Sequence, residues 1–269
     1  MERQKKFKLG LACAGIAVSI PLSWLLIARV ITADDVIPSI PDKDVGSGNG
    51  SSFQFARLRY PGGVPGYLKN SYTDYPAMDK HLTLLVGRMT NVDAAAPVIV
   101  DPTSPHIFDY PMIYSVEPEQ MVLGVQEAAN LREYLTRGGF WFADDFHGDD
   151  EFNDFLVQIR RVLPGASVKE LDISHPLFHC FYDISKIIQV TNDGIAKCPE
   201  CDQFENGPSG KDPKVFGILD EQGRIEVLMA WNTDLGDGLE WADDPEYPSN
   251  YSAYAFKFMT NVIVYAMTH

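Results

Sequence analysis

Gly138-Gly-Phe-Trp-Phe-Ala-Asp-Asp-Phe146 is the stretch of sequence that decides the fold. The two glycines end the helical pattern of residues 125–137, as glycine commonly does just past the last helical turn. The all-apolar run 140–143 is typical of a strand that is buried on both faces. Helical and strand patterns alternate on either side of it. This alternation predicts a mainly parallel α/β sheet with helices on both faces.

Hydrophobic periodicity places the other elements. The expected strands are 53–58, 97–100, 112–116, 140–143 and 168–171, followed by a late antiparallel hairpin from 215–219 and 225–231. The expected helices are 74–89, 125–137, 149–162 and 251–267. Residues 191–213 are a polar loop rich in Gly, Pro and Cys, called the excursion below, and residues 232–250 are an acidic loop. The whole of 53–269 is therefore expected to form one α/β domain.

The N-terminus follows a membrane-targeting pattern. Basic residues precede the stretch 9–28, which contains no charged residue and is about 30 Å long as a helix, enough to cross a bilayer core. Positive charge before such a span holds that end in the cytoplasm. We therefore expect residues 1–31 to be a basic tip with a transmembrane anchor or uncleaved signal. Residues 32–52, rich in Pro and then in Gly and Ser, read as a linker to a domain outside the cytoplasm.

Charge is distributed unevenly along the chain. The net charge is −15, and residues 1–31 carry +4, so that residues 32–269 carry −19. A domain this acidic repels the phosphates of nucleic acids, and no stripe of Lys and Arg offsets the repulsion. Nucleic-acid binding is therefore not expected.

The chain contains four cysteines, of which Cys13 lies in the expected anchor. Outside the cytoplasm, Cys198 and Cys201 are candidates for a small disulfide loop, and the alternative is that Cys180, Cys198 and Cys201 are idle thiols. A zinc site needs two such pairs or one pair with suitably spaced histidines, and the sequence offers one pair.

Acidic and polar residues follow three of the predicted strands. Asp101 follows 97–100, Asp144 and Asp145 follow 140–143, and Asn232 and Asp234 follow 225–231. Ligands of parallel α/β sheets bind beyond the carboxyl ends of the strands, so these side chains are candidates for a common site. Clustered carboxylates repel one another, and either a proton or a cation relieves the repulsion. The alternative is that each Asp caps the next helix or fixes a turn.

Three other segments contain candidate residues. Asp74 reads most simply as the cap of the helix 74–89. It could instead belong to the common site beyond the carboxyl ends of the strands. His175 and His179 are four residues apart, but Pro176 argues against the regular helix that would let both bind one metal. In the loop 232–248, Asp237 and neighbouring acidic residues beside Trp and Tyr suit Ca²⁺ or sugar hydroxyls, although the spacing is not that of an EF-hand.

Several catalytic motifs are absent from the sequence. There is no nucleophile elbow, no phosphate-binding loop and no dinucleotide fingerprint after a strand. Serine or cysteine hydrolase, nucleotidase and dinucleotide-dependent activities are therefore disfavoured.

Several segments together resemble the domain-of-unknown-function 4159 family. They are 55–60, 73–79, 138–146, 175–179, 232–238 and 265–269, in that order along the chain. The resemblance implies a flavodoxin-like sheet of the class I glutamine amidotransferase-like type. It also implies bacterial, membrane-linked proteins, some encoded beside MoxR-type ATPases and von Willebrand A-domain proteins. It implies no activity.

This chain departs from the family pattern at a few positions. His147 stands where Trp is expected, Trp231 where a polar residue is expected, and Leu239 where Trp is expected. The segment around Cys198 is particular to this chain. Amidotransferases have a cysteine nucleophile after the strand that here ends in Asp144, so glutamine hydrolysis is not expected.

Three hypotheses follow for a domain on the outer side of the bacterial inner membrane. The first is a binding module for an envelope protein or glycan. The second is a metal-assisted hydrolase, in which a divalent cation held by strand-end carboxylates activates water. The third is a scaffold that docks other envelope proteins. The ligand and the cofactor are not identified by the sequence.

Overall fold

The computed structural model describes residues 53–62 and 70–269. The described residues all belong to one compact unit, Ser47–His269. The predicted anchor at 9–28 and the linker at 32–52 lie outside the described residues. Within the described part of the chain, no helix combines the length and the apolar character that a bilayer crossing requires.

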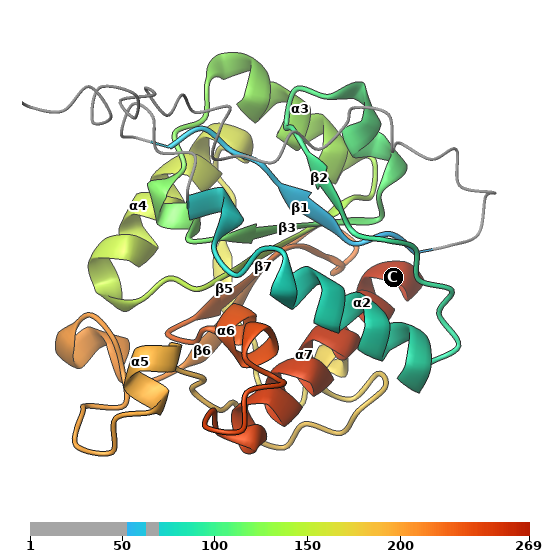
Figure 1. Ribbon diagram of the computed structural model, residues 1–269. Coiled ribbons are helices and arrows are strands. Elements are labelled where there is room, and N and C mark those ends of the chain that lie inside the picture. The colour runs from blue at the N-terminus through green and yellow to red at the C-terminus, as the bar shows by residue number, and fades with distance from the viewer. Residues whose placement is uncertain (1–52, 63–69) are drawn as a thin grey trace, which may run out of the picture. The chain divides into compact units, whose positions relative to one another are not determined.

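The domain is a mixed α/β structure around a seven-stranded, mostly parallel sheet (Figure 1). The strands are β1 (Ala56–Leu58), β2 (Val98–Val100), β3 (Met112–Val116), β4 (Phe140–Asp144), β5 (Val168–Glu170), β6 (Lys214–Leu219) and β7 (Ile225–Trp231). Their order across the sheet is β2-β1-β3-β4-β7-β6-β5. The first five strands in this order are parallel, and β6 runs antiparallel to both β7 and β5. The late antiparallel hairpin is therefore confirmed.

Helices cover both faces of the sheet, with α3 and α4 on one face and α2, α6 and α7 on the other (Figure 1). The α-helices are α2 (Ala77–Met89), α3 (Val125–Thr136), α4 (Gly148–Val162), α5 (Asp193–Ala196), α6 (Leu235–Glu240) and α7 (Ser249–Thr268). Short 3-10 turns are η2 (Asn70–Tyr72), η3 (Pro105–Asp109), η4 (Pro118–Gln120), η5 (Pro176–Phe178) and η6 (Gly207–Gly210).

The first four residues of β4, Phe140 to Ala143, are all apolar because both faces of the strand are covered. Phe140 and Phe142 pack into the core under α7, whereas Trp141 and Ala143 point to the core under α3 and α4. Successive side chains of a strand alternate between faces, so a strand covered on both sides needs apolar residues at every position. Burying each large side chain contributes roughly 1.5–3 kcal/mol relative to leaving it exposed.

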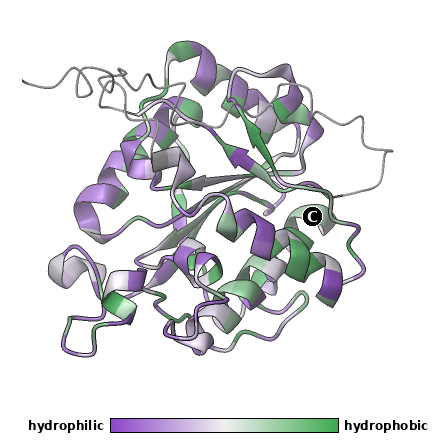
Figure 2. Cartoon of the chain, in the orientation of Figure 1, coloured by the Kyte–Doolittle hydropathy of each residue, from purple (hydrophilic) through white to green (hydrophobic). Residues whose placement is uncertain are grey.

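The helices differ in how much apolar surface they bury. Figure 2 shows hydrophilic residues over much of α4 and more hydrophobic residues along α7. In α4, Phe155 and Ile159 face the core, and acidic residues occupy the first turn while Arg160 and Arg161 occupy the last. That charge distribution complements the helix dipole. The amphipathic pattern predicted for this segment is therefore matched by its burial.

Two expectations about the loops need correction. Helix α2 begins at Ala77, and Asp74 does not cap it, because Asp74 adopts a left-handed conformation with φ 65° three residues earlier. The acidic loop 232–250 contains the short helix α6, which Asp234 caps by accepting a hydrogen bond from the backbone N–H of Asp237. Both corrections concern the carboxyl edge of the sheet, defined here as the edge at which β1, β3, β4 and β7 end.

Candidate functional site

Acidic side chains from three separate segments meet at the carboxyl edge. Asp74 lies in the connection after β1, and Asp145 follows β4. The third segment follows β7 and contains Asp234, which caps helix α6, together with Asp237 and Glu240 of that helix. One oxygen from each of Asp74, Asp145 and Asp234 lies within 4.8 Å of the others, and the same is true of Asp74, Asp237 and Glu240. We call these five residues the carboxylate cluster.

The backbone around the cluster is unusual. Five non-glycine residues in the described part of the chain have positive φ, and four of them lie at the carboxyl edge: Asp74, Glu117, Asp145 and Asn232. A left-handed conformation costs free energy for residues with a side chain, and such residues concentrate at functional sites. At the ends of β3, β4 and β7, this conformation turns the chain immediately after the strand.

Arg57 of β1 holds the segment that carries Asp74. Its Nη2 lies 2.6 Å from Oδ2 of Asp79 in α2, and both side chains are fully buried. Its Nη1 donates a hydrogen bond of 2.9 Å to the carbonyl oxygen of Thr73. Arg57 therefore fixes the backbone immediately before Asp74 and supplies positive charge near it.

The Asp74 carboxylate points into a space kept open by a glycine. Its Oδ2 atom is buried and receives no hydrogen bond. A Cβ atom added to Gly236 would lie 2.0 Å from this oxygen, so a side chain at position 236 would collide with it. An unpaired buried carboxylate oxygen is costly unless an ion, water or proton satisfies it.

Asp144 lies beneath the cluster, at the last position of β4. Its Oδ2 accepts hydrogen bonds from the backbone N–H of Gly236 at 3.1 Å and from the Tyr114 hydroxyl at 3.3 Å. Its Oδ1 is buried and has no partner. Burial raises the pKa of Asp144 to about 7, against the lowering effect of these hydrogen bonds. Asp144 therefore positions the start of α6 and takes up a proton near neutral pH.

Asp145 faces a histidine. Its Oδ1 lies 3.1 Å from Nε2 of His147, and the same nitrogen lies 3.8 Å from Glu205. Nδ1 of His147 is buried without a partner. Burial, and then the negative charges of Glu117 and Asp144, raise the pKa of Asp145 well above its usual range.

The other members of the cluster are also hard to ionise. Burial raises the pKa of Asp74 and of Asp234 well above the usual range, and the charge of Asp145 is the next cause for both. Burial also raises the pKa of Asp237, although the backbone N–H of Asp193 and the indole N–H of Trp241 donate hydrogen bonds to it. Without a counter-ion, the cluster therefore holds protons that isolated carboxyls would release.

Asn232 has a structural role at this edge. Its Oδ1 accepts a hydrogen bond from the backbone N–H of Gly148, and its Nδ2 donates to the carbonyl oxygens of Ser209 and Asp212. These bonds tie β7 to the start of α4 and to the segment 209–212. The amide is therefore occupied by backbone groups and supports the site without facing it.

Two candidate residues lie away from the cluster. Asp101 forms a half-exposed ion pair with Arg59 and accepts hydrogen bonds from Thr103, which is the local turn role considered as the alternative. His175 accepts a hydrogen bond from the backbone N–H of Leu177 and packs near Tyr265. Tyr265 contacts Phe140, the first residue of β4, so His175 lies at the opposite, amino edge of the sheet.

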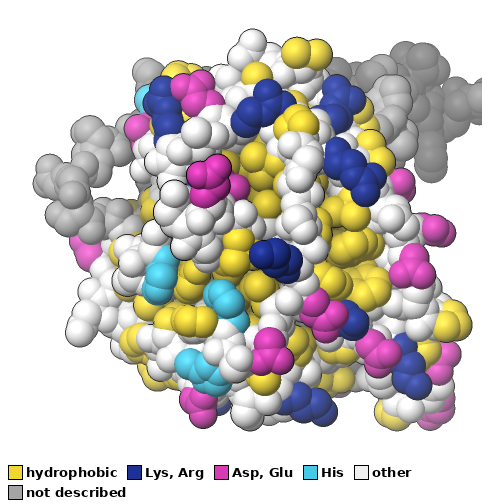
Figure 3. Space-filling view, turned by 180° about the vertical axis from the view of Figure 1, so that it is seen from behind, with side chains coloured by type: hydrophobic (Ala, Val, Ile, Leu, Met, Phe, Trp, Pro, Cys, Tyr) yellow, Lys and Arg dark blue, Asp and Glu magenta, His cyan; other side chains and the backbone are white. Residues whose placement is uncertain are grey.

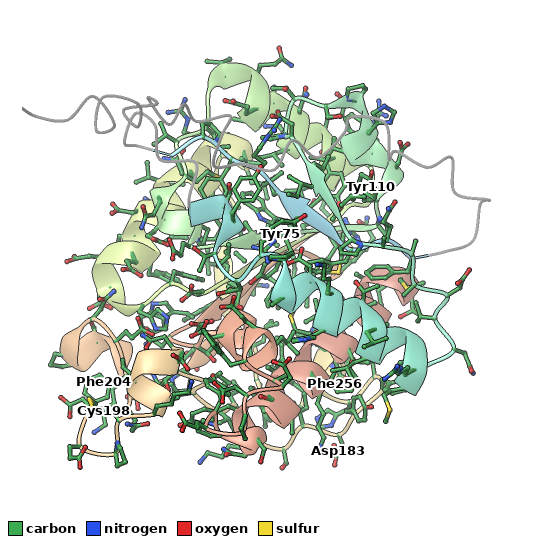
Figure 4. The ribbon with its side chains drawn as sticks, viewed as in Figure 1. Tyr75, Tyr110, Asp183, Cys198, Phe204 and Phe256 are labelled. Atoms are coloured by element: carbon green, nitrogen blue, oxygen red, sulfur yellow. A yellow bond between two sulfur atoms is a disulfide. The ribbon has the colours of Figure 1, made fainter. Side chains whose placement is uncertain are left out.

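The cysteines behave as their spacing suggested. Cys198 and Cys201 form a disulfide, and Cys180 is free and half-buried. Figure 4 labels Cys198 and Phe204 in the excursion after α5, and labels Tyr75, the neighbour of Asp74, near β1 and the start of α2. The excursion contacts the site through Asn206, whose Nδ2 donates to the carbonyl oxygen of His147.

Sequence reasoning did not select Glu117 or Glu240 as ligand candidates. Glu117 directly follows β3, the same signal that selected Asp144 and Asp145. Glu240 lies three residues after Asp237, a spacing that places two side chains on one face once α6 is known to be a helix. The roles of Arg57 and Gly236 have no comparable local signal, because both depend on contacts between distant segments.

Among the curated proteins, none matches this chain. A family model does match residues 54–267, nearly the whole described domain, and it is the one for the domain of unknown function DUF4159. The match covers the segments that form the carboxyl edge as well as the sheet. The chain therefore belongs to the DUF4159 family.

Proposed function

We propose that this domain is a binding module whose carboxylate cluster holds a divalent cation. The observation that carries the proposal is the buried, unpaired Oδ2 of Asp74 among carboxylates from other segments. A cation would satisfy this oxygen and neutralise the mutual repulsion of the cluster at once. The ligand atoms are carboxylate oxygens, which favour hard cations such as Ca²⁺, Mg²⁺ or Mn²⁺ over Zn²⁺.

The burial of the cluster supports an ion as the direct ligand. Asp74, Asp145, Asp234 and Asp237 are between 3% and 8% exposed, and carboxylates buried this deeply suit an ion, which they contact directly, better than a sugar ring, which needs open surface. An envelope protein or glycan would then bind through the outward coordination positions of the cation. The strand order β2-β1-β3-β4-β7 supports the flavodoxin-like arrangement, in which ligands bind at this edge.

The cellular setting is part of the proposal. The basic residues before the apolar stretch 9–28 support a single-pass anchor in a bacterial inner membrane, with the domain on the periplasmic side. Partners encoded with the family, such as MoxR-type ATPases and von Willebrand A-domain proteins, remain candidates for a functional link.

A metal-assisted hydrolase is the second candidate. His147 favours it, because a buried imidazole beside Asp145, with one unpartnered nitrogen, is suited to accept a proton from cation-bound water. The departure of this position from the family pattern argues against a reaction shared by the family. A His147→Gln variant that retains cation binding but loses phosphate-ester or peptide hydrolysis would support the enzyme over the binding module.

The test uses the full chain, purified in detergent and stripped of metal with a chelator. Calorimetric titration with Ca²⁺, Mg²⁺ and Mn²⁺ should show binding by the wild type, and a cation at a hundred times its Kd should raise the free energy of unfolding by about 2.7 kcal/mol. Asp234→Asn should weaken binding, whereas the matched Asp243→Asn, at an exposed position, should not. Absence of binding and of any thermal shift with all three cations would refute the proposal.

A further inference from the structure

The five carboxylates divide into two sets that share one residue. Asp74, Asp145 and Asp234 form one set, and Asp74, Asp237 and Glu240 form the other. We infer that the cluster holds two divalent cations bridged by the Asp74 carboxylate, an inference that rests on the proposed cation-binding function. The second cation site is the one on α6, completed by Glu240.

The separations fit two ions better than one. Cation–oxygen distances of about 2.0–2.6 Å place the ligands of one ion at most about 4–5 Å apart. Each set of three meets this limit at 4.8 Å, but the five residues do not form a single group at this separation. One ion therefore cannot bind all five carboxylates with the side chains in their present positions. Two ions about 3.5–4 Å apart share one carboxylate naturally.

The charge of the cluster also requires more than one ion. Five ionised carboxylates carry five negative charges, and one divalent cation leaves three of them uncompensated. A second cation leaves one. The field of Arg57 favours the ionised form of Asp74, although the charge of Arg57 itself is paired with Asp79. In a buried site, uncompensated charge is expensive, so occupancy of the second site relieves repulsion that the first ion leaves.

Asp74 is placed to serve as the bridge. Its Oδ2 has no hydrogen-bond partner although the residue is 6% exposed. Gly236 allows this oxygen to lie where a side chain would otherwise be, since a Cβ at position 236 would lie 2.0 Å from it. Arg57 binds the carbonyl oxygen of Thr73 instead of the Asp74 carboxylate. The carboxylate is therefore held in place by its backbone, and its Oδ2 is the oxygen without a hydrogen-bond partner.

The second site has its own spectroscopic reporter. The indole Nε1 of Trp241 donates a hydrogen bond of 3.2 Å to Oδ1 of Asp237. Nζ of Lys197 lies 4.8 Å from the centre of the same indole ring. A cation bound by Asp237 draws electron density from this carboxylate and changes the environment of the indole. Trp241 fluorescence should therefore respond to the second ion.

The experiment titrates the chelator-treated full chain with Mn²⁺, measuring stoichiometry by calorimetry and the electron paramagnetic resonance spectrum. The wild type should bind two Mn²⁺ per chain and give an exchange-coupled spectrum. Glu240 is partly exposed, and its replacement by Gln is isosteric. The Glu240→Gln variant should bind one Mn²⁺, give the spectrum of an isolated ion and lose the fluorescence response of Trp241. Glu246→Gln, at an exposed position of the same loop, is the matched control and should behave as the wild type.

The outcomes separate the two proposals. One Mn²⁺ per wild-type chain would overturn the binuclear site and leave the cation-binding function standing. Two Mn²⁺ in the Glu240→Gln variant would overturn the assignment of the second site to α6. No Mn²⁺ in the wild type would overturn both. Circular dichroism and thermal unfolding of each variant establish that a loss of binding is not a loss of fold.

Discussion

Two arginines tie loops to the sheet at its opposite edges. At the amino edge, Arg224 donates hydrogen bonds to the carbonyl oxygens of Gly138 and Gly139 and to Asp220. At the carboxyl edge, Arg57 donates to the carbonyl oxygen of Thr73 and pairs with Asp79. The side chain of Arg224 is 17% exposed, whereas that of Arg57 is fully buried.

The two edges differ in the kinds of side chain that they gather. The amino edge has a hollow of about 340 Å³ lined by residues such as Phe108, Tyr110 and Arg137, with the guanidinium of Arg137 over the Phe108 ring. Viewed from behind, the molecule shows hydrophobic side chains with both basic and acidic side chains and several histidines among them (Figure 3). The carboxyl edge instead gathers acidic groups near Arg57. Burying like charges together costs stability, and such arrangements are common at functional sites.

Replacing each of the two arginines should give the largest difference between the edges, measured as the loss in the free energy of unfolding. Arg57→Ala should lower the free energy of unfolding by about 3–5 kcal/mol, because it leaves Asp79 buried and unpaired. Arg224→Ala should cost about 1 kcal/mol, because water reaches the freed carbonyl oxygens. Denaturant unfolding of both variants measures the contrast. Equal costs would mean that the two edges do not differ as described.

Gly236→Ala should damage the site more than the fold. Its Cβ would meet Oδ2 of Asp74, so cation affinity should fall on the order of 10- to 100-fold, as for other changes that displace a ligand. Gly87→Ala in α2 is the matched control, because its Cβ would make an ordinary contact of 3.8 Å with Ala94. Calorimetry with Mn²⁺ on both variants checks the prediction, and unchanged affinity in Gly236→Ala would contradict it.

The metal-free protein should lose stability as the pH rises. The pKa of Asp144 is raised from 3.8 to about 7 in the folded state, so the folded protein binds this proton more tightly than the unfolded chain does. The stabilisation is complete below pH 4 and is lost as the pH rises through about 7. Asp74, Asp145 and Asp234 act in the same direction.

Thermal unfolding between pH 5 and pH 8, with a chelator present, measures how steeply the stability of the metal-free protein falls with pH. Asp144→Asn should flatten it, and saturating Mn²⁺ should reverse it, because the cation competes with protons for the cluster. A metal-free protein that becomes more stable towards pH 8 would show that the carboxyls are ionised without an ion.

Substitutions at candidate residues outside the carboxylate cluster should have the smallest effects on stability and cation affinity. Asp101→Asn removes a half-exposed ion pair and should cost less than about 1 kcal/mol, with cation affinity unchanged. His175→Gln changes a residue at the amino edge and should also leave affinity unchanged. A loss of cation binding in either variant would extend the site beyond the residues assigned to it.

Much of the fold is readable from local patterns. The strand predicted at 140–143 is β4 (Phe140–Asp144), and the strands predicted at 112–116 and 225–231 are β3 and β7 with the same bounds, because apolar runs between turn residues have few other stable solutions. Helix α6 was not predicted, because six residues with two glycines carry little helical signal. Asp234 and the packing of Leu235 and Leu239 into the core stabilise it instead.

The sequence by itself determined the acidic character of the domain, its α/β class and the presence of carboxylates after strands β4 and β7. These properties depend on composition and on short-range periodicity. Only the tertiary structure decided that Asp74 joins Asp145 and Asp234 while Asp101 and His175 do not. That choice depends on strand order and on the left-handed turns after the strands. It also depends on contacts between segments far apart in the chain, such as the Arg57–Asp79 pair, because Arg57 also holds the backbone before Asp74.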